Sequence, residues 1–220
     1  MCGRYRLSRR KQIVEEYFDS PSDDMDWVPR FNIAPTQPVP VIRQHPRKPV
    51  RELSLMKWGL VPSWAKNSSV SASMINARSE TASTKPAFRD ALKSRRCLIS
   101  ADGFYEWVRT QKAKQPYCFE VNGGDLFAFA GLWEGWKDSN GNWLKTCSIL
   151  TTTPNDVTKA VHDRMPVILD PSSSPHPLHL MRIRPHLQWE AGFRRSSCHP
   201  KHHLARRWRS SAAILLRYLL

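Results

Sequence analysis

The chain of 220 residues is 40% hydrophobic and 10% aromatic, a composition that predicts a folded protein with one sizeable core. Its formal net charge of +15 points to a polyanionic partner. No stretch approaches the about 20 apolar residues of a membrane span, and the Arg-rich start lacks the apolar region of a signal peptide. We therefore expect a cytoplasmic protein without membrane contact, associated with the nucleoid if it is bacterial.

The first third of the chain is expected to contain one helix and two strands. Residues 8–18 have apolar side chains at helical spacing, and Ser8 is a plausible N-cap. Residues 39–42 and 51–60 have the composition of strands. The three prolines between 35 and 40 favour an edge strand or an irregular connection over a central strand.

The middle of the chain is predicted to be rich in strands. Residues 66–74 are Ser-rich and form an expected loop, and a second helix is expected over residues 86–95, beginning at Pro86. Closely spaced strands follow, with Gly123-Gly124 and Asn140-Gly141 as turns between them. The predicted strands are 97–101, 104–109, 116–121, 126–133 and 145–152. A short helix over 155–161 and a last strand over 165–169 complete this part.

Strands dominate and mostly follow one another directly. This order predicts an α+β fold, with mostly antiparallel strands in a barrel-like sheet and a few short helices. Past Pro171 the composition changes, because residues 172–220 hold six of the eight histidines and nine Lys or Arg against one acidic residue. We interpret residues 1–171 as one domain and residues 172–220 as an atypical basic tail, either disordered or encoded out of frame.

The five cysteines include no Cys-x-x-Cys pair. Neither a zinc site nor a thioredoxin motif is therefore supported, and we expect no metal and no other cofactor. An odd number of widely spaced cysteines is typical of a reducing compartment. Cys97, Cys118 and Cys147 are expected to be small buried apolar residues.

Cys2 directly follows the initiator methionine. Removal of Met1 would leave an α-amine and a thiol on adjacent carbons. The pKa of the amine is about 8 and that of the thiol about 8.5. The amine can condense with an aldehyde to an imine, and the thiol can then close a five-membered thiazolidine ring. The alternative is that Cys2 lies at a frayed terminus and has no chemical role.

Three further polar residues are candidates for a site. Glu106 lies between two aromatic residues on a predicted strand; if it points inward, burial raises its pKa and makes it a general acid or base. It can equally face solvent. His162 suits proton transfer, although a lone histidine is more often structural. Asn76 has an amide that can fix an amine or an oxyanion, although an Asn at this kind of position is commonly a turn former.

Seven motifs, in order along residues 1–171, resemble those of the SRAP (SOS-response-associated peptidase) family. They are Met1-Cys2-Gly3-Arg4, Phe31-Asn32-Ile33-Ala34-Pro35-Thr36, Trp58-Gly59-Leu60-Val61-Pro62-Ser63-Trp64, Asn76-Ala77-Arg78-Ser79-Glu80-Thr81, Arg96-Cys97-Leu98-Ile99, Gly103-Phe104-Tyr105-Glu106-Trp107 and His162-Asp163-Arg164-Met165-Pro166. So many ordered matches are highly specific. The family fold, an α+β pseudo-barrel, agrees with the strand-rich pattern.

The resemblance implies a protein that binds single-stranded DNA at abasic sites, links to it covalently through Cys2 and protects the site during the DNA damage response. By this resemblance Met1 is removed, the new amine forms an imine at the sugar C1′, and the Cys2 thiolate closes a thiazolidine. Glu106 matches the residue that assists proton transfer, including Met1 release. His162 matches the residue that helps the imine step, and Asn76 the one that holds the terminal cysteine. Strand cleavage through the imine, a lyase reaction, is also implied.

The resemblance also suggests how DNA is held. Arg4 and Arg78 match arginines near the site and would contact phosphates. Trp64 and Trp107 offer faces on which unpaired bases can stack, with core packing as the alternative. Pro40 is a candidate wedge against a base. The expected partner is single-stranded DNA containing abasic sites, bound by a monomer.

The chain departs from the family after residue 171, where the basic tail replaces further strands expected to close the sheet. Two other functions stay open. Cys2 can be the N-terminal nucleophile of a thiol peptidase or amidase, as the family name records. Alternatively, the protein can bind nucleic acid without covalent chemistry, through charge alone, with steep salt sensitivity and no dependence on Cys2.

Overall fold

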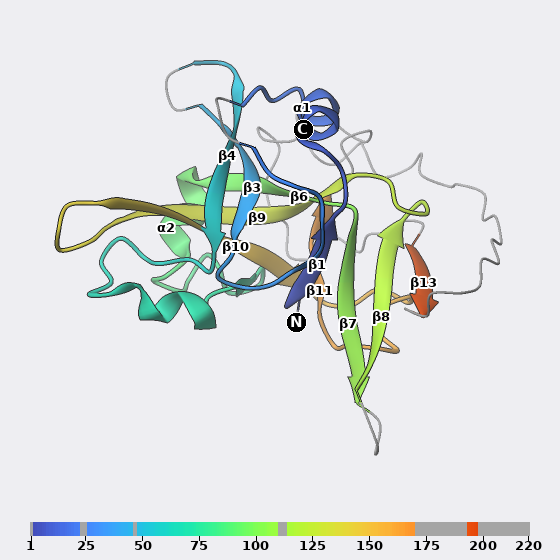
Figure 1. Ribbon diagram of the computed structural model, residues 1–220. Coiled ribbons are helices and arrows are strands. Elements are labelled where there is room, and N and C mark those ends of the chain that lie inside the picture. The colour runs from blue at the N-terminus through green and yellow to red at the C-terminus, as the bar shows by residue number, and fades with distance from the viewer. Residues whose placement is uncertain (1, 23–25, 46–47, 110–113, 170–192, 198–220) are drawn as a thin grey trace.

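The computed structural model describes residues 2–22, 26–45, 48–109, 114–169 and 193–197. Five of its strands close into a barrel (Figure 1). The ring runs through β3 (Pro38–Gln44), β4 (Arg51–Trp58), β10 (Trp143–Thr152), β9 (Phe127–Lys137) and β6 (Arg96–Ala101), and returns from β6 to β3. The β4–β10 pairing is parallel and the other four are antiparallel. The expected α+β fold with a barrel-like sheet is confirmed.

A second sheet leaves the barrel where β6 ends. Its order is β13 (Phe193–Ser197), β8 (Lys114–Val121), β7 (Gly103–Arg109), β1 (Arg4–Leu7) and β2 (Arg30–Ile33). Only Asp102 separates β6 from β7, so the two sheets share one continuous stretch of chain. The β1–β7 pairing lays the first residues of the chain along the strand that carries Glu106.

Short elements complete the fold. β5 (Asn76–Arg78) and β11 (Met165–Pro166) pair with β10, and β12 (Ile168–Leu169) pairs with β9. The helical segments are α1 (Lys11–Phe18), the 3-10 segment η1 (Ser68–Ser73) and α2 (Arg89–Ser94). Because β5 and β11 lie along the same strand, β10 brings together segments that are distant in sequence.

Aromatic packing joins the two sheets. The buried ring of Tyr5 on β1 meets Trp58 of the barrel edge-on, with ring centroids 5.3 Å apart, and Phe129 at 5.5 Å. Edge-to-face pairs of this kind add to the free energy gained by burying the rings. The indole N–H of Trp58 also donates to the carbonyl of Ile75 at 2.9 Å. Trp58 therefore contacts both β1 and Ile75, the residue before Asn76.

The helices differ from the expected ones. α1 begins at Lys11, and Ser8 is not its N-cap. Instead, the backbone N–H of Ser8 donates to Oδ2 of the buried Asp102 at 2.7 Å, and its hydroxyl donates to the same oxygen. α2 begins at Arg89, after a series of turns that contains Pro86. Residues 155–161 form turns and no helix, so that prediction is wrong.

The Pro-rich strand also corrects the prediction. β3 lies inside the barrel, between β4 and β6, and not at an edge. However, β6 pairs only with Val41 and Ile42, so Pro38 and Pro40 lie in the half of β3 whose sole partner strand is β4. Proline is tolerated there because it lacks only the N–H that a second partner would need.

Cys97, Cys118 and Cys147 are buried, as expected. Of residues 172–220, the structure describes only β13, which pairs antiparallel with β8 from Phe193↔Val121 to Ser197↔Tyr117. The expected disorder or out-of-frame origin of the other residues of this segment lies outside the described residues. Within the described part, no helix is long and apolar enough to cross a membrane.

We predict that Gly59→Ala lowers the free energy of unfolding by about 3 kcal/mol, against about 1 kcal/mol for the control Gly123→Ala. Both glycines have positive φ, +129° and +85°. A Cβ at Gly59 would lie 2.4 Å from the carbonyl oxygen of Ser71, whereas one at Gly123 meets nothing within 4 Å. Urea denaturation of both variants measures the difference; equal losses would mean that the close approach at Ser71 does not matter.

Candidate active site at the chain terminus

Cys2 lies two residues before β1 and is fully buried. Asn76 Nδ2 donates to the backbone carbonyl of Cys2 at 2.8 Å. Asn76 itself is fixed by the parallel pairing of β5 with β10, opposite Ile149. Its side-chain oxygen Oδ1 is buried and accepts no hydrogen bond from the residues that the structure describes. Asn76 therefore anchors the backbone of Cys2 and keeps one acceptor available beside the amino end.

Glu106 points inward from β7. Phe104 and Glu106 are buried, whereas Tyr105 and Trp107 on the opposite face are partly exposed. Of the two orientations that the sequence allows, the structure has the inward one. Burial raises the pKa of Glu106 from 4.5 to about 7. The side chain can therefore take up or release a proton near neutral pH.

Cys2 and Glu106 are within electrostatic range of each other. Burial raises the pKa of the Cys2 thiol far above its ordinary value, and the negative charge of Glu106 raises it further. The thiol is therefore neutral at physiological pH in this state. A thiolate at this position needs a base or a change of surroundings before it can form.

His162 lies on the turn that leads into β11, with 27% of its side chain exposed. Its Nδ1 accepts the backbone N–H of Arg164 at 3.0 Å and lies 2.7 Å from Oδ1 of Asp163. Burial lowers the pKa of His162, against the opposing effect of Asp163. Asp163 also contributes to the raised pKa of Glu106, so the His162 turn lies within electrostatic range of that carboxyl group.

An ion pair that the sequence does not indicate joins the segment after His162 to the segment after Asn76. Arg164 donates to both carboxylate oxygens of Glu80, at 3.0 and 2.8 Å, and to the carbonyl of Thr151 at 2.7 Å. The hydrogen bond from Arg164 lowers the pKa of Glu80. This bidentate contact holds the His162 turn against the end of the Asn76 segment. Both residues lie inside the motifs, but their pairing carries no local sequence signal.

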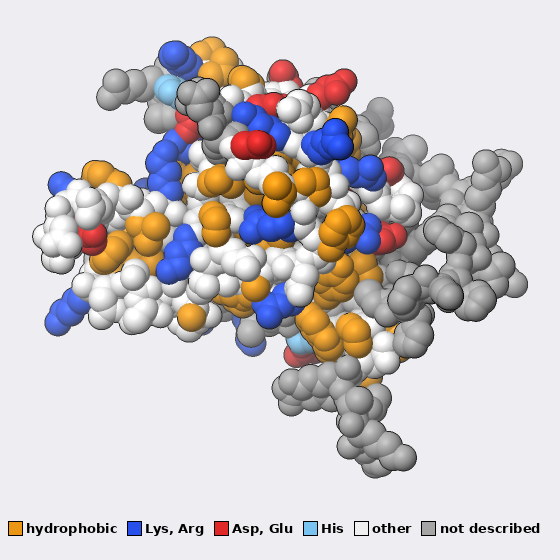
Figure 2. Space-filling model, viewed as in Figure 1, with side chains coloured by type: hydrophobic (Ala, Val, Ile, Leu, Met, Phe, Trp, Pro, Cys, Tyr) orange, Lys and Arg blue, Asp and Glu red, His pale blue; other side chains and the backbone are white. Residues whose placement is uncertain are grey.

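The expected DNA-contact residues differ in exposure. Arg78 is exposed at the end of β5, Arg4 is partly exposed on β1, and Trp64 has 65% of its surface exposed. Trp107 is partly exposed. Pro40 is buried within β3, so it lacks the free surface that a wedge against a base requires. Figure 2 shows Lys and Arg side chains spread over the face that carries β4, β3 and β1, with hydrophobic side chains between them.

The structure brings Cys2, Asn76 and Glu106 into one buried corner, with the His162 turn at its side. This corner combines a buried thiol near the amino end, a carboxyl group whose pKa is raised to about 7 and, beside it, an imidazole. Within the described ranges, no group of three His, Cys, Asp or Glu side chains could hold a metal ion.

Comparisons with known proteins agree on one family. The model of the family "SOS response associated peptidase (SRAP)" matches residues 1–188. The Bacillus subtilis "Abasic site processing protein YoqW" is 45% identical over 172 residues, which cover 77% of this chain and 76% of that protein. The Xenopus tropicalis "Abasic site processing protein HMCES" is 33% identical over 213 residues, covering 77% and 63%. A crystal structure of a Bacteroides thetaiotaomicron protein superposes with a TM-score of 0.72 at 25% identity, covering 85% and 83%.

The raised pKa of Glu106 predicts a pH-dependent cost to stability. Between the pKa of about 4.5 expected in the unfolded chain and about 7 in the folded protein, only the unfolded chain ionises, so stability falls as pH rises through this window. Glu106→Gln cannot ionise. We expect it to gain up to about 3 kcal/mol relative to the wild type between pH 4 and pH 8. Urea denaturation across this range tests it, and a difference independent of pH would contradict it.

Proposed function

Because the chain belongs to the family of SOS response associated peptidases (SRAP), we propose that it processes abasic sites in DNA, with the corner around Cys2 as its active site. The observation that carries the proposal is the buried Cys2, anchored by Asn76, within range of a carboxyl group whose pKa is about 7. The opened sugar of an abasic site presents an aldehyde at C1′. An aldehyde is the electrophile that an adjacent amine and thiol capture together.

The reaction begins with removal of Met1, which exposes the α-amine of Cys2. The amine adds to the C1′ aldehyde and water leaves, so that an imine forms. The sulfur then adds to the imine carbon, and the thiol proton passes to the imine nitrogen. The product is a thiazolidine that joins the protein to DNA through one C–N and one C–S bond, with no oxidant or reductant consumed.

The order of the two nucleophiles follows from their surroundings. The buried thiol is neutral, whereas an α-amine with a pKa of about 8 is partly unprotonated at pH 7. The amine therefore attacks first. Glu106, with a pKa of about 7, can then accept the thiol proton and deliver one to the leaving hydroxyl or to the nitrogen.

Asn76 and His162 are proposed to assist the reaction in different ways. Asn76 fixes the Cys2 carbonyl through Nδ2, and its buried Oδ1 is suited to accept an N–H from the terminal amine. His162, whose pKa is lowered by burial, supplies a neutral imidazole for proton exchange with the sugar hydroxyls. Strand cleavage through the imine is a side reaction of the same intermediate.

We propose single-stranded DNA as the substrate, held by phosphate contacts to Arg4 and Arg78 and by base stacking on Trp64 and Trp107. The exposure of Arg78 and Trp64 supports this assignment. Pro40 is left out because it is buried. The catalytic domain is proposed to comprise residues 1–171, working as a monomer, with residues 172–220 as an atypical basic tail; the family match continues to residue 188, and β13 of the tail pairs with β8.

A second activity is supported by the position of Glu106. The same carboxyl group that would serve the thiazolidine lies beside Cys2, where a general base can assist hydrolysis of the Met1–Cys2 bond. We propose that this peptidase activity is directed at the protein's own first residue. A peptidase acting on other chains would use the same thiol, and cleavage of unrelated peptides would favour it.

Cys2→Ala is predicted to abolish the heat-stable adduct with single-stranded DNA that carries one abasic site. The variant keeps an α-amine, so it still forms an imine that borohydride can trap, but it has no sulfur to close the ring. A denaturing gel run with and without borohydride separates the two steps, and DNA with all bases intact is the control. A heat-stable band of wild-type intensity from Cys2→Ala without borohydride would refute the thiazolidine.

Glu106→Gln is predicted to slow removal of Met1, because the amide keeps the shape of the side chain but cannot accept a proton. Intact-mass spectrometry of freshly expressed protein measures the fraction that retains Met1. Glu16→Gln, which makes the same change at an exposed carboxyl group on α1 outside the site, is the matched control. Complete processing of Glu106→Gln would exclude the proposed role.

A further inference from the structure

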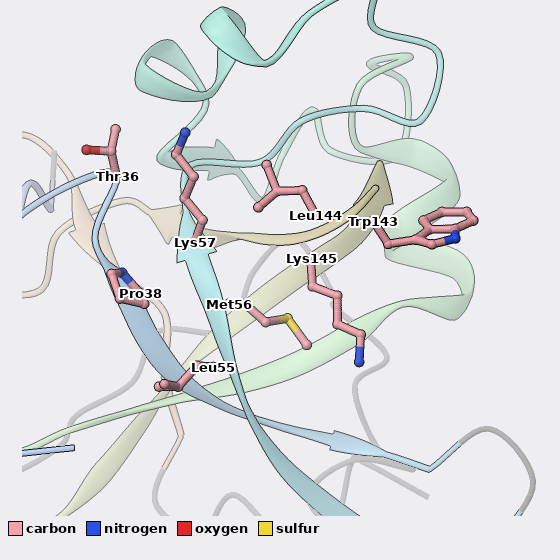
Figure 3. A pocket seen from close by; sticks show the side chains of 8 residues that line it. All are labelled: Thr36, Pro38, Leu55, Met56, Lys57, Trp143, Leu144 and Lys145. Atoms are coloured by element: carbon pink, nitrogen blue, oxygen red, sulfur yellow. The ribbon is translucent and has the colours of Figure 1, made fainter. Parts of the chain in front are cut away.

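A groove of about 500 Å³ lies outside the Cys2 corner, where the strands β4 and β10 cross (Figure 3). Its walls come from the start of β3, the end of β4 and the start of β10. The lining residues are Thr36, Pro38, Leu55, Met56, Lys57, Trp143, Leu144 and Lys145. None of these residues belongs to the proposed active site.

Trp143 is the most exposed aromatic residue among those that the structure describes, with 70% of its surface accessible. It lies at the start of β10, in the ribbon that β9 and β10 form beyond the barrel (Figure 1). Its six-membered ring lies over Gly135, where a Cβ would come within 3.5 Å of it. The indole is therefore supported from the ribbon and still open to solvent, which is the arrangement of a stacking platform.

The groove is positively charged. Lys57 and Lys145 line it, and the ammonium group of Lys137 lies 5.8 Å from the ring centroid of Trp143. No described carboxylate forms an ion pair with these three lysines. The nearby Asp138 instead accepts the backbone N–H groups of Asn140 and Asn142 in the ribbon turn, at 2.9 and 2.8 Å. The surface thus combines uncompensated cations with one exposed indole, a combination that fits the phosphates and bases of an unpaired strand.

The groove and the active site share β10. Asn76 pairs with Ile149, and Trp143 precedes Ile149 by six residues, a separation of about 20 Å along a strand. We propose that the groove binds the same DNA strand a few nucleotides away from the abasic site, with a base stacked on Trp143 and phosphates contacting Lys57 and Lys145. This inference rests on the proposed function and extends its DNA footprint to the far end of β10.

The test measures binding without the covalent chemistry. Fluorescence anisotropy follows an undamaged single strand of about ten nucleotides, within the range that small single-strand-binding domains cover. Trp143→Ala is expected to weaken binding roughly 10-fold, with an unchanged salt dependence, because a stacked base is lost. Lys145→Met is expected to reduce the slope of log affinity against log salt by about 0.7, because one phosphate contact is lost. Lys93→Met on α2, outside the groove, is the matched control and should bind like the wild type.

A second comparison separates this inference from the proposed function. An abasic trinucleotide is too short to reach the groove, so Trp143→Ala should crosslink it at the wild-type rate but crosslink the longer abasic strand more slowly. Equal behaviour of Trp143→Ala and the wild type on both strands overturns the groove and leaves the Cys2 chemistry intact. A change in the oligomeric state of Trp143→Ala, with unchanged DNA binding, would assign the groove to protein contact and likewise overturn it.

Discussion

The antiparallel pairing of β1 with β7 is the constraint on which the rest of the site depends. Arg4 lies opposite Tyr105, and this register lays the amino end along the strand that buries Glu106. The pairing is fixed at its far end by Asp102, a fully buried carboxylate that accepts hydrogen bonds from Ser8 and from the guanidinium of Arg6 at 2.9 Å. A buried carboxylate is tolerated only when partners satisfy it, so a slip of β1 by one residue would leave Asp102 unpaired as well as move Cys2.

The fold class could be predicted from the sequence, and the residues of the candidate site could be singled out, because both leave local signals. Short strands follow one another between turn residues, and the turns at Gly124 and Gly141 have the positive φ that favours glycine. Cys2, Asn76, Glu106 and His162 each lie inside a recognisable motif. The inward orientation of Glu106 was one of two possibilities that the sequence allowed, and the packing of Phe104 on the same face decided it.

What could not be predicted depends on partners that are distant along the chain. Ser8 has the side chain of an N-cap, but it is hydrogen-bonded to Asp102, 94 residues away, and lies outside the helix. The contact between Arg164 and Glu80 spans 84 residues. Burial of Pro40 follows from the neighbours of β3 in a closed barrel, which the local prolines do not indicate. The position of the Trp143 ring likewise depends on Gly135, which lies diagonally across on the paired strand, opposite Lys145.

The burial of Cys2 has a consequence for the lifetime of the protein in a cell. Peroxides and alkylating agents react with exposed thiolates, and Cys2 is neither exposed nor ionised. In the proposed reaction Cys2 is consumed in a single covalent event, so its thiol must stay unmodified until that event occurs. Because the sulfur is shielded and neutral, we expect slow oxidation of Cys2 in the folded chain. The thiol would then persist in the presence of oxidants, the same conditions that damage DNA.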